Sequence, residues 1–574
     1  MKSLSRMVSG KVAAPLVMLF ALAFAFFAFT LPSESESAPS VGLAETNDTM
    51  IVADVLAELP GQDGTAAIVV YRTADGSAMT DAQQEWILGE KKVITPFPGA
   101  PEIVTYEGGA NEKFADYSNL EIDGKPFVAP ATLSDDTSTA SIFVSLDEYT
   151  AEEPCTPVKA TEALEACSTV QLTTLRVSEI RALAAESIPA GLNTAMTGPE
   201  GFQADLNNVF AGANFTLLGT TALVVILLLL ITYRSPTLWI IPLFVIGTAD
   251  GMAGRLAATV AGWFGIDNLD GSVTGILSVL VFGAGTNYAL LMISRYREEL
   301  LKYANRRDAM MAAWRGAAPA IIASGLTVIL ALSTLTLAGL EGTRALGIAC
   351  ATGVFLAMIS ALFVLPAALV SFGRWIFWPV APKVGGVNKS DSGLWAKLGR
   401  GVNKRPIIVA IVGLGILGGL ASGASGVQIG LSANDRFVSK PEAVVGAEYL
   451  SAGFGSETTV DVIAKNGFED EVVAAAKTVD GVKDAEVATL PITNEVLKGD
   501  EYTKITVTLE AESLSQDAFD AIKGLRAEFE TMADAGALVG GQEAQQLDIK
   551  SSYERDQSLI IPLILALVFI VLLL

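Results

Sequence analysis

The stretch Gly283-Ala-Gly-Thr-Asn-Tyr-Ala-Leu-Leu-Met-Ile-Ser-Arg-Tyr-Arg-Glu-Glu-Leu300 contributes most to deciding the fold of this chain. It ends an apolar run long enough to cross a bilayer, and it places the polar cluster Thr286-Asn287-Tyr288 inside that run. Basic residues follow at once. Polar groups in hydrocarbon are costly unless they are paired, so an intramembrane polar cluster favours a functional role. The stretch therefore predicts a membrane-spanning helix that carries a site and ends at a basic loop.

Composition supports a membrane protein and excludes several classes of enzyme. The 574 residues are 51% hydrophobic, with a mean hydropathy of +0.47, which is too apolar for an ordinary soluble protein. A formal charge of −24 argues against a nucleic-acid or an anionic-lipid partner for the protein as a whole. The chain has no histidine, which excludes a histidine base, a histidine metal ligand and a Ser-His-Asp triad. With no phosphate-binding loop or metal-spaced ligand cluster either, we expect neither an enzyme nor a bound cofactor.

Eight apolar stretches are long enough to cross a membrane as helices. They are residues 12–32, 215–233, 237–260, 271–293, 317–338, 345–371, 406–424 and 558–574. We expect the first to be a retained helix rather than a signal peptide, because Ser33-Glu-Ser-Glu-Ser-Ala is a poor cleavage site. The last stretch reaches Leu574 without a flanking charge, so we expect it to be an incomplete span.

Lysine and arginine at the ends of the spans predict the orientation. Lys2, Arg6 and Lys11 precede the first span, and the segments 294–316 and 372–405 are also rich in basic residues. The N-terminus and the loop 372–405 are therefore predicted to be cytoplasmic. The two large polar regions, 33–214 and 425–557, then lie outside the cytoplasm and hold nearly all of the acidic excess.

Each external region alternates strand-like and helix-like segments in the same order, which indicates an internal repeat. In the first region we expect strands at 65–72, 140–146 and 192–198, with helices beginning near 81 and over 172–190. In the second we expect strands at 459–464, 504–509 and 537–541, with helices over 469–479 and 514–532. In both, the last strand leads into a helix that continues into a span. Two α+β domains, one after the first helix of each half, are therefore predicted.

Cys155 and Cys167 lie twelve residues apart in the first external region. A disulfide between them is expected if the region is extracytoplasmic, and two free or lipid-shielded thiols are the alternative.

The whole pattern resembles the MmpL branch of the RND superfamily of transporters. The similar motifs are Gly198-Pro-Glu-Gly-Phe202, Tyr233-Arg-Ser-Pro236 and the opening stretch, of which the last is the most specific. The resemblance implies an RND architecture: a multi-span α-helical membrane protein with two ferredoxin-like, porter-type external domains. It also implies twelve spans in a complete member, so spans nine to twelve are expected to be missing here.

The same resemblance implies a proton relay through an Asp-Tyr pair on the fourth span and a second pair on the tenth. Here Asn287 stands where the family usually has aspartate, and an amide cannot carry a proton. Tyr288 is retained beside it. Three accounts stay open: a natural subfamily with one titrating site, loss of proton coupling, and an engineered Asp→Asn exchange.

Asp250 and Arg255 are charged residues within the third predicted span. Asp250 is a candidate for the proton relay or for an ion pair with Arg255. The alternative is a structural polar pair that faces a neighbouring helix.

The predicted function is export of a lipid or another hydrophobic compound across a bacterial cell envelope, with proton flow as the energy source and the plasma membrane as the location. Expected partners are the substrate, the membrane and, in addition, further copies or envelope accessory proteins. A non-transporting scaffold in envelope assembly is the main alternative, because the titrating residue is lost. A sterol-sensing, Patched-like protein is a weaker alternative.

Overall fold

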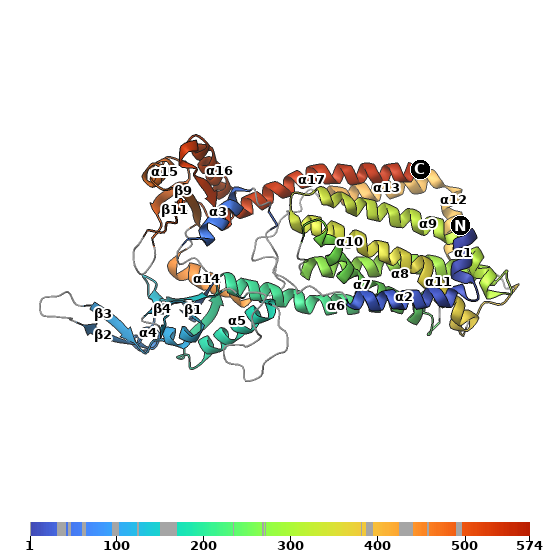
Figure 1. The fold of residues 1–574 in the computed structure, drawn as a ribbon, viewed down its shortest axis with the longest axis horizontal. Helices are drawn as coiled ribbons and strands as arrows, with labels where there is room; N and C mark the ends of the chain where they lie inside the picture. Colours follow the sequence, from blue (N-terminus) through green and yellow to red (C-terminus); the bar gives the residue numbers. More distant parts are fainter. Residues whose placement is uncertain are drawn as a thin grey trace.

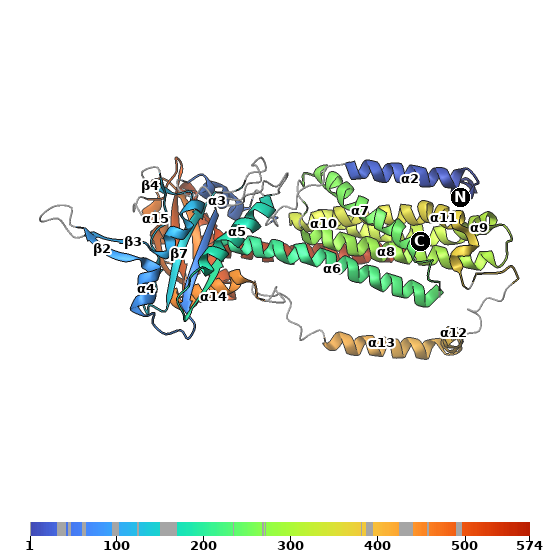
Figure 2. The same cartoon turned by 90° about the horizontal axis from the view of Figure 1, so that it is seen from below.

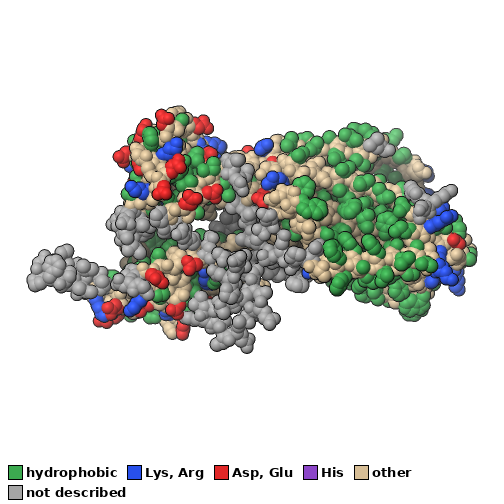
Figure 3. Space-filling view, viewed as in Figure 1, with side chains coloured by type: hydrophobic (Ala, Val, Ile, Leu, Met, Phe, Trp, Pro, Cys, Tyr) green, Lys and Arg blue, Asp and Glu red, His purple; other side chains and the backbone are tan. Residues whose placement is uncertain are grey.

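The computed structural model describes residues 2–573 apart from 31–41, 44–46, 60–64, 95–102, 123–124, 148, 150–168, 234, 267–268, 270, 380, 386–393, 424–439, 456–457 and 490–495. The molecule is elongated, with long helices at one end and two α+β domains at the other (Figure 1). Hydrophobic side chains cover the helices, and lysine and arginine gather at the end away from the domains (Figure 3). We call the two ends of the helical bundle the domain end and the basic end.

The bundle consists of long apolar helices that correspond to the predicted spans. They are α2 (Ala13–Thr30), α6 (Pro199–Tyr233), α7 (Ile240–Gly262), α8 (Gly271–Leu300), α9 (Arg306–Ser333), α10 (Glu341–Ile359), α13 (Pro406–Gly423) and α17 (Gly541–Leu573). A π-helical segment η3 (Ser360–Val364) and α11 (Leu365–Phe372) continue α10. Within the described residues, seven helices are long and apolar enough to cross a membrane, and Leu218–Thr232 of α6 adds a shorter apolar stretch. The multi-span prediction is confirmed.

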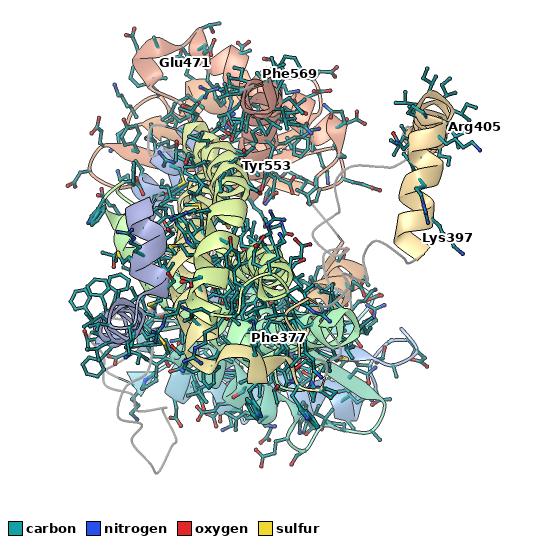
Figure 4. The ribbon with its side chains drawn as sticks, turned by 90° about the vertical axis from the view of Figure 1, so that its right-hand side faces the viewer. Phe377, Lys397, Arg405, Glu471, Tyr553 and Phe569 are labelled. Carbon is teal, nitrogen blue, oxygen red and sulfur yellow. The ribbon has the colours of Figure 1, made fainter. Side chains whose placement is uncertain are left out.

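Two short helices lie at the basic end, α1 (Lys2–Ser9) and α12 (Leu394–Lys404), and the short helical segments η2 (Thr334–Leu337) and η4 (Gly373–Phe377) follow α9 and α11. Helix α1 packs against α9 and α2. Helix α13 stands apart from the other long helices, and none of its side chains is buried (Figure 2). Viewed along the bundle, α12 with Lys397 also lies apart from the helical segments that carry Phe377 and Phe569 (Figure 4).

Small residues set how closely the central helices approach. A Cβ atom at Gly353 of α10 would lie 2.4 Å from Leu277 and 2.6 Å from Val281, both on α8. A Cβ atom at Gly325 of α9 would lie 2.5 Å from the Met358 sulfur of α10. Glycine therefore allows the close approach of these helices at both crossings.

The first α+β domain is built on the antiparallel sheet β6-β7-β1-β8. Its strands are β6 (Thr132–Leu133), β7 (Thr139–Leu146), β1 (Thr65–Thr73) and β8 (Leu192–Thr197), and its helices are α4 (Asp81–Leu88) and α5 (Thr169–Ala185). An insertion holds the hairpin β2 (Glu90–Ile94) and β3 (Ile103–Glu107), the segment η1 (Ala110–Tyr117), and the pair β4 (Glu121–Ile122) and β5 (Lys125–Pro126). The hairpin projects away from the bundle (Figure 1).

The second α+β domain has the same topology without the insertion. Its sheet runs β10-β11-β9-β12, with β9 (Thr458–Lys465), β10 (Val482–Val487), β11 (Tyr502–Leu509) and β12 (Leu538–Gly540). Helices α15 (Glu469–Ala476) and α16 (Gln516–Glu530) pack on it, and the turn η8 (Ala533–Ala535) precedes β12. The order strand-helix-strand-strand-helix-strand in an antiparallel sheet is ferredoxin-like, as predicted.

A tight turn joins the last strand of each domain to a membrane helix. Gly198 after β8 has φ +94° and Gly541 after β12 has φ +84°. A Cβ atom would lie 2.9 Å from the Ala66 carbonyl oxygen at Gly198, and 3.0 Å from the Asp461 nitrogen at Gly541. Both turns therefore favour glycine, since the backbone is left-handed and neighbouring backbone lies close. Helices α6 and α17 begin at these turns and run without a break into the bundle.

The two domains exchange one helix each. Helix α3 (Asp48–Ala57) precedes β1 in the chain but packs against β12, β9 and α17 of the second domain. Helix α14 (Glu442–Phe454) precedes β9 but packs against β8, β7 and β1 of the first. The predicted ranges 33–214 and 425–557 treat each domain as one continuous segment, so they do not describe this exchange. From sequence order alone, each short helix would be assigned to the domain that follows it in the chain, and not to the other domain, where it packs.

Similar groups of polar side chains hold the exchanged helices. In the first domain, Arg181 of α5 pairs with Asp205 of α6 at 2.8 Å, and Asp205 accepts the Ala443 N–H of α14 at 2.9 Å. We call this group, with Glu442 lying 3.3 Å from Arg181, the first exchange contact.

The second exchange contact repeats the arrangement in the other domain. Arg526 of α16 pairs with Asp548 of α17 at 2.6 Å, and the Thr49 hydroxyl of α3 donates to Asp548. Asp548 is buried and the Arg526 side chain is 22% exposed. Desolvation at Arg526 opposes the positive charge, but the hydrogen bond and charge of Asp548 outweigh it and raise the Arg526 pKa.

Candidate functional site on the fourth span

The polar cluster lies in the middle of α8, and its three side chains have different surroundings. Thr286 is buried, and its hydroxyl donates to the Phe282 carbonyl oxygen one turn earlier, at 2.6 Å. Tyr288 is also buried. Asn287 is exposed, and no described residue forms a hydrogen bond with its side chain. Of the three side chains, only that of Asn287 is exposed and therefore open to a further binding partner.

Asn287 belongs to a continuous exposed stripe on α8. Its other members recur every three or four residues, which is one face of a helix: Ile276, Val279, Gly283 and Leu291. An open apolar pocket of about 270 Å³ lies against this face and is lined by Gly275, Ile276, Val279 and Leu280. The stripe is apolar apart from Asn287, so the amide is its main polar feature.

Tyr288 faces α9 rather than the exposed stripe. Its hydroxyl interacts with the Ser324 side chain. The sequence does not single out Ser324 as part of the site, because serine in a membrane helix more often bonds to its own backbone. The spacing along α9 carries no signal that would separate Ser324 from the other hydroxyl residues of that helix.

Asp250 and Arg255 have different partners, so the predicted ion pair between them is not present in the structure. The Ser278 hydroxyl of α8 donates to the Asp250 carboxylate at 2.9 Å. Arg255 lies instead over the ring of Phe29 on α2, with its guanidinium carbon 4.7 Å from the ring centroid. Five positions along a helix turn side chains well away from each other, whereas positions three or four apart face the same side.

Asp250 is also separate from the polar cluster. Its partner Ser278 precedes Asn287 by nine residues on α8, which corresponds to about 13 Å along the helix. Ser278 is nearer the domain end, and Asn287 is nearer the basic end. A proton that used both groups would need a route between them, and the described side chains alone do not supply a direct contact.

The basic end of α8 is held by charged side chains. Arg295 pairs with Glu298 at 2.9 Å, and Lys302 pairs with the buried Glu299 at 2.9 Å. Arg374 of η4 donates to the carbonyl oxygen of Leu300, the last residue of α8, and to that of Tyr303 in the segment that follows. Cations at a helix C-terminus are favourable, so these residues stabilise the end of the span. Cys155 and Cys167, the predicted disulfide pair, lie outside the described residues.

The architecture defines the class of protein: a multi-span membrane protein with two ferredoxin-like domains. Comparison with known proteins agrees with it. The MMPL family model matches residues 40–409 and 460–574. The chain belongs to the MMPL family. Family membership and the names of relatives indicate a transport protein rather than an enzyme, as predicted.

Three relatives illustrate the range of the family. A Streptomyces coelicolor protein named as a membrane protein, ActII-3, is 36% identical over 86% of this chain and 67% of its own length. The apo-petrobactin exporter of Bacillus anthracis is 29% identical over 99% of this chain and 77% of its own length. A Mycobacterium tuberculosis protein named as a transport protein, MmpL9, is 32% identical over 48% of this chain and 28% of its own. The chain spans between 55% and 67% of the lengths of the Streptomyces coelicolor relatives it matches.

Proposed function

We propose that this chain is part of an exporter that moves a lipid or another hydrophobic compound across the cell envelope, with proton flow as the energy source. The observation that carries the proposal is the position of the Thr286-Asn287-Tyr288 cluster in the middle of an apolar helix. An intramembrane polar group of this kind favours an ion or proton pathway. Its open face also leaves Asn287 accessible to a partner helix that carries a titrating group.

Continuous helices offer a route from this site to the domains. Helix α6 packs along α8 and begins directly at the end of β8 in the first domain. Helix α17 packs along α9, which carries Ser324, and begins at the end of β12 in the second domain. A shift of α8 or α9 would therefore be passed to both domains through rigid elements. In this proposal the domains form the path of the substrate.

The proposal includes an orientation in a bacterial plasma membrane. The N-terminus and the basic end face the cytoplasm, and both α+β domains lie outside, because lysine and arginine mark cytoplasmic segments. Further copies of the chain or envelope accessory proteins are proposed partners. No bound cofactor is needed if the proton gradient supplies the energy.

The test is efflux of a lipophilic probe, Nile red, from cells that express the chain. We expect faster efflux than from cells with an empty vector, and loss of the difference when a proton uncoupler is added. The variant Tyr288→Phe should slow efflux at least several-fold, because it removes the hydroxyl that interacts with Ser324. The matched control is Thr327→Ala, whose hydroxyl bonds to the Ala323 carbonyl oxygen of its own helix at 2.7 Å.

Other outcomes separate the alternatives. Efflux that the uncoupler leaves unchanged would contradict proton coupling. Full efflux by Asp250→Asn would remove that carboxylate from the relay. Absence of any efflux by protein that is correctly inserted would favour the scaffold in envelope assembly, which the amide at position 287 supports.

A further inference from the structure

Arg255 is a cation inside a membrane helix, and no acidic side chain of the described residues forms an ion pair with it. It lies on α7, seven residues before the helix ends at Gly262, which places its Cα atom about 10 Å from the domain end of the helix. No carboxylate of the described residues lies within 4 Å of it, and the nearby Asp250 on the same helix accepts a hydrogen bond from Ser278 instead. A charged group at this depth is costly unless it finds a partner, and such groups are commonly functional.

The described surroundings of Arg255 leave part of its hydrogen-bonding capacity unused. The guanidinium stacks on the Phe29 ring, and Gly251 makes room for that ring, since a Cβ atom there would lie 2.9 Å from it. Stacking satisfies the charge in part but accepts no hydrogen bond from the guanidinium edge. The Arg255 Nε atom is buried and has no hydrogen-bond partner among the residues that the structure describes.

An apolar track leads away from this position along α2. Phe29 is 48% exposed, and Phe26 and Leu22 are exposed on the same face of the helix, three and seven residues earlier. The guanidinium therefore lies where α2 meets α7, at one end of an exposed apolar surface that is suited to a hydrocarbon chain. It is in the half of the bilayer nearer the domains.

We propose that Arg255 and Phe29 form a binding site for an amphiphile with an anionic head, a phosphate or a carboxylate, whose chain lies along α2. The planar guanidinium can hold two oxygens of such a head through parallel hydrogen bonds. The head would supply the acceptors and the negative charge that the described residues around Arg255 do not. A bilayer phospholipid and an acidic exported compound share this chemistry. The binding site itself goes beyond the proposed transport, and only its assignment to an exported compound rests on that proposed function.

Native mass spectrometry of the purified full chain tests this site with two probes, phosphatidylglycerol and phosphatidylcholine. We expect the wild-type chain to retain phosphatidylglycerol in preference to phosphatidylcholine. Arg255→Gln should weaken phosphatidylglycerol binding by about tenfold, because a charge-assisted pair is lost. Arg255→Lys should weaken it less, since a point charge remains. Phe29→Leu should also weaken it, whereas the control Phe20→Leu, on the opposite face of α2, should not.

A second readout separates a binding role from a structural one. Arg255→Gln removes an unpaired charge from the bilayer, so its thermal unfolding temperature should equal or exceed that of the wild-type chain. A lower unfolding temperature with unchanged preference for phosphatidylglycerol would overturn the proposal. Equal binding of phosphatidylglycerol and phosphatidylcholine by the wild-type chain would also overturn it.

Competition by dodecyl phosphate identifies the source of the ligand. Displacement of phosphatidylglycerol that depends on Arg255 would show that one chain and an anionic head are enough, as expected for an exported acid. Failure to displace it, with phosphatidylglycerol binding still dependent on Arg255, would assign the site to a bilayer lipid. Binding of both probes by Arg255→Gln at wild-type affinity would rule out both sources.

Discussion

At the scale of single residues, hydroxyl groups on α8 and α9 provide partners for the functional candidates. The sequence identified Asn287, Tyr288 and Asp250 because polar residues in an apolar run are conspicuous. It could not identify Ser278 and Ser324, since every hydroxyl in a membrane helix has a local carbonyl oxygen as an alternative acceptor. Whether a hydroxyl bonds to its own backbone or to a side chain of a neighbouring helix depends on how the two helices are rotated. The membrane-spanning parts of α8 and α9 are too uniformly apolar for a periodic pattern to predict that rotation.

The variant Ser278→Ala should destabilise the bundle by about 0.6–1.7 kcal/mol, which runs from the average to the maximum measured for side-chain hydrogen bonds between membrane helices. The reason is that Asp250 loses the donor that lies 2.9 Å from its carboxylate. The control Thr274→Ala, also on α8, removes a hydroxyl that bonds only to the Gly271 carbonyl oxygen of its own helix. It should change stability by less than about 0.5 kcal/mol. Unfolding of the purified protein measures both, and equal effects would contradict the role of Ser278.

At the scale of helices and strands, close packing depends on glycines at a few crossings. Gly353→Ala should destabilise the protein by about 1–3 kcal/mol, because the added methyl group overlaps Leu277 and Val281 of α8. Gly415→Ala is the matched control, since no atom lies within 4 Å of its added Cβ on the separate helix α13. The control should be neutral or slightly stabilising, because alanine favours a helix over glycine. A neutral Gly353→Ala would show that α8 and α10 can separate without cost.

The helix exchange makes a reciprocal prediction about the two domains. Arg526→Ala leaves the buried Asp548 unpaired, so α3 should open more easily, by about 2–3 kcal/mol. Removing one partner of a fully buried ion pair costs about 3–5 kcal/mol, and the expected cost here is lower because Arg526 is partly exposed. Hydrogen exchange should therefore rise in Asp48–Ala57, far from the mutation in sequence, and stay unchanged in Glu442–Phe454.

Arg181→Ala should give the opposite pattern, with faster exchange in α14 and no change in α3. Lys523→Ala serves as the control for α16, since it removes an exposed pair with Asp520 and should affect neither exchanged helix. Faster exchange in both helices with either arginine variant would mean that the two exchange contacts are not independent.

At the scale of the whole molecule, most of the architecture could be predicted from the sequence, because it follows from periodic patterns and repeated order. The spans, both ferredoxin-like sheets, and the helices α6 and α17 that run from the domains into the bundle could all be predicted in this way. The exchange of α3 and α14 could not be predicted. Both helices are short, and a short segment of this kind carries no information about which of two similar domains it will complete.

Orientation is a property of the whole molecule, and labelling of single cysteines in intact cells tests it. In a variant with Cys155, Cys167 and Cys350 replaced, a cysteine at exposed Lys523 should react with a membrane-impermeant maleimide, because it lies in a proposed external domain. A cysteine at exposed Lys397 of α12 should react only after the cells are made permeable, because α12 lies at the basic end. The reverse pattern would invert the proposed direction of export. It would also place the basic end, with Arg295 and Arg374, on the outside, against the retention of lysine and arginine in the cytoplasm.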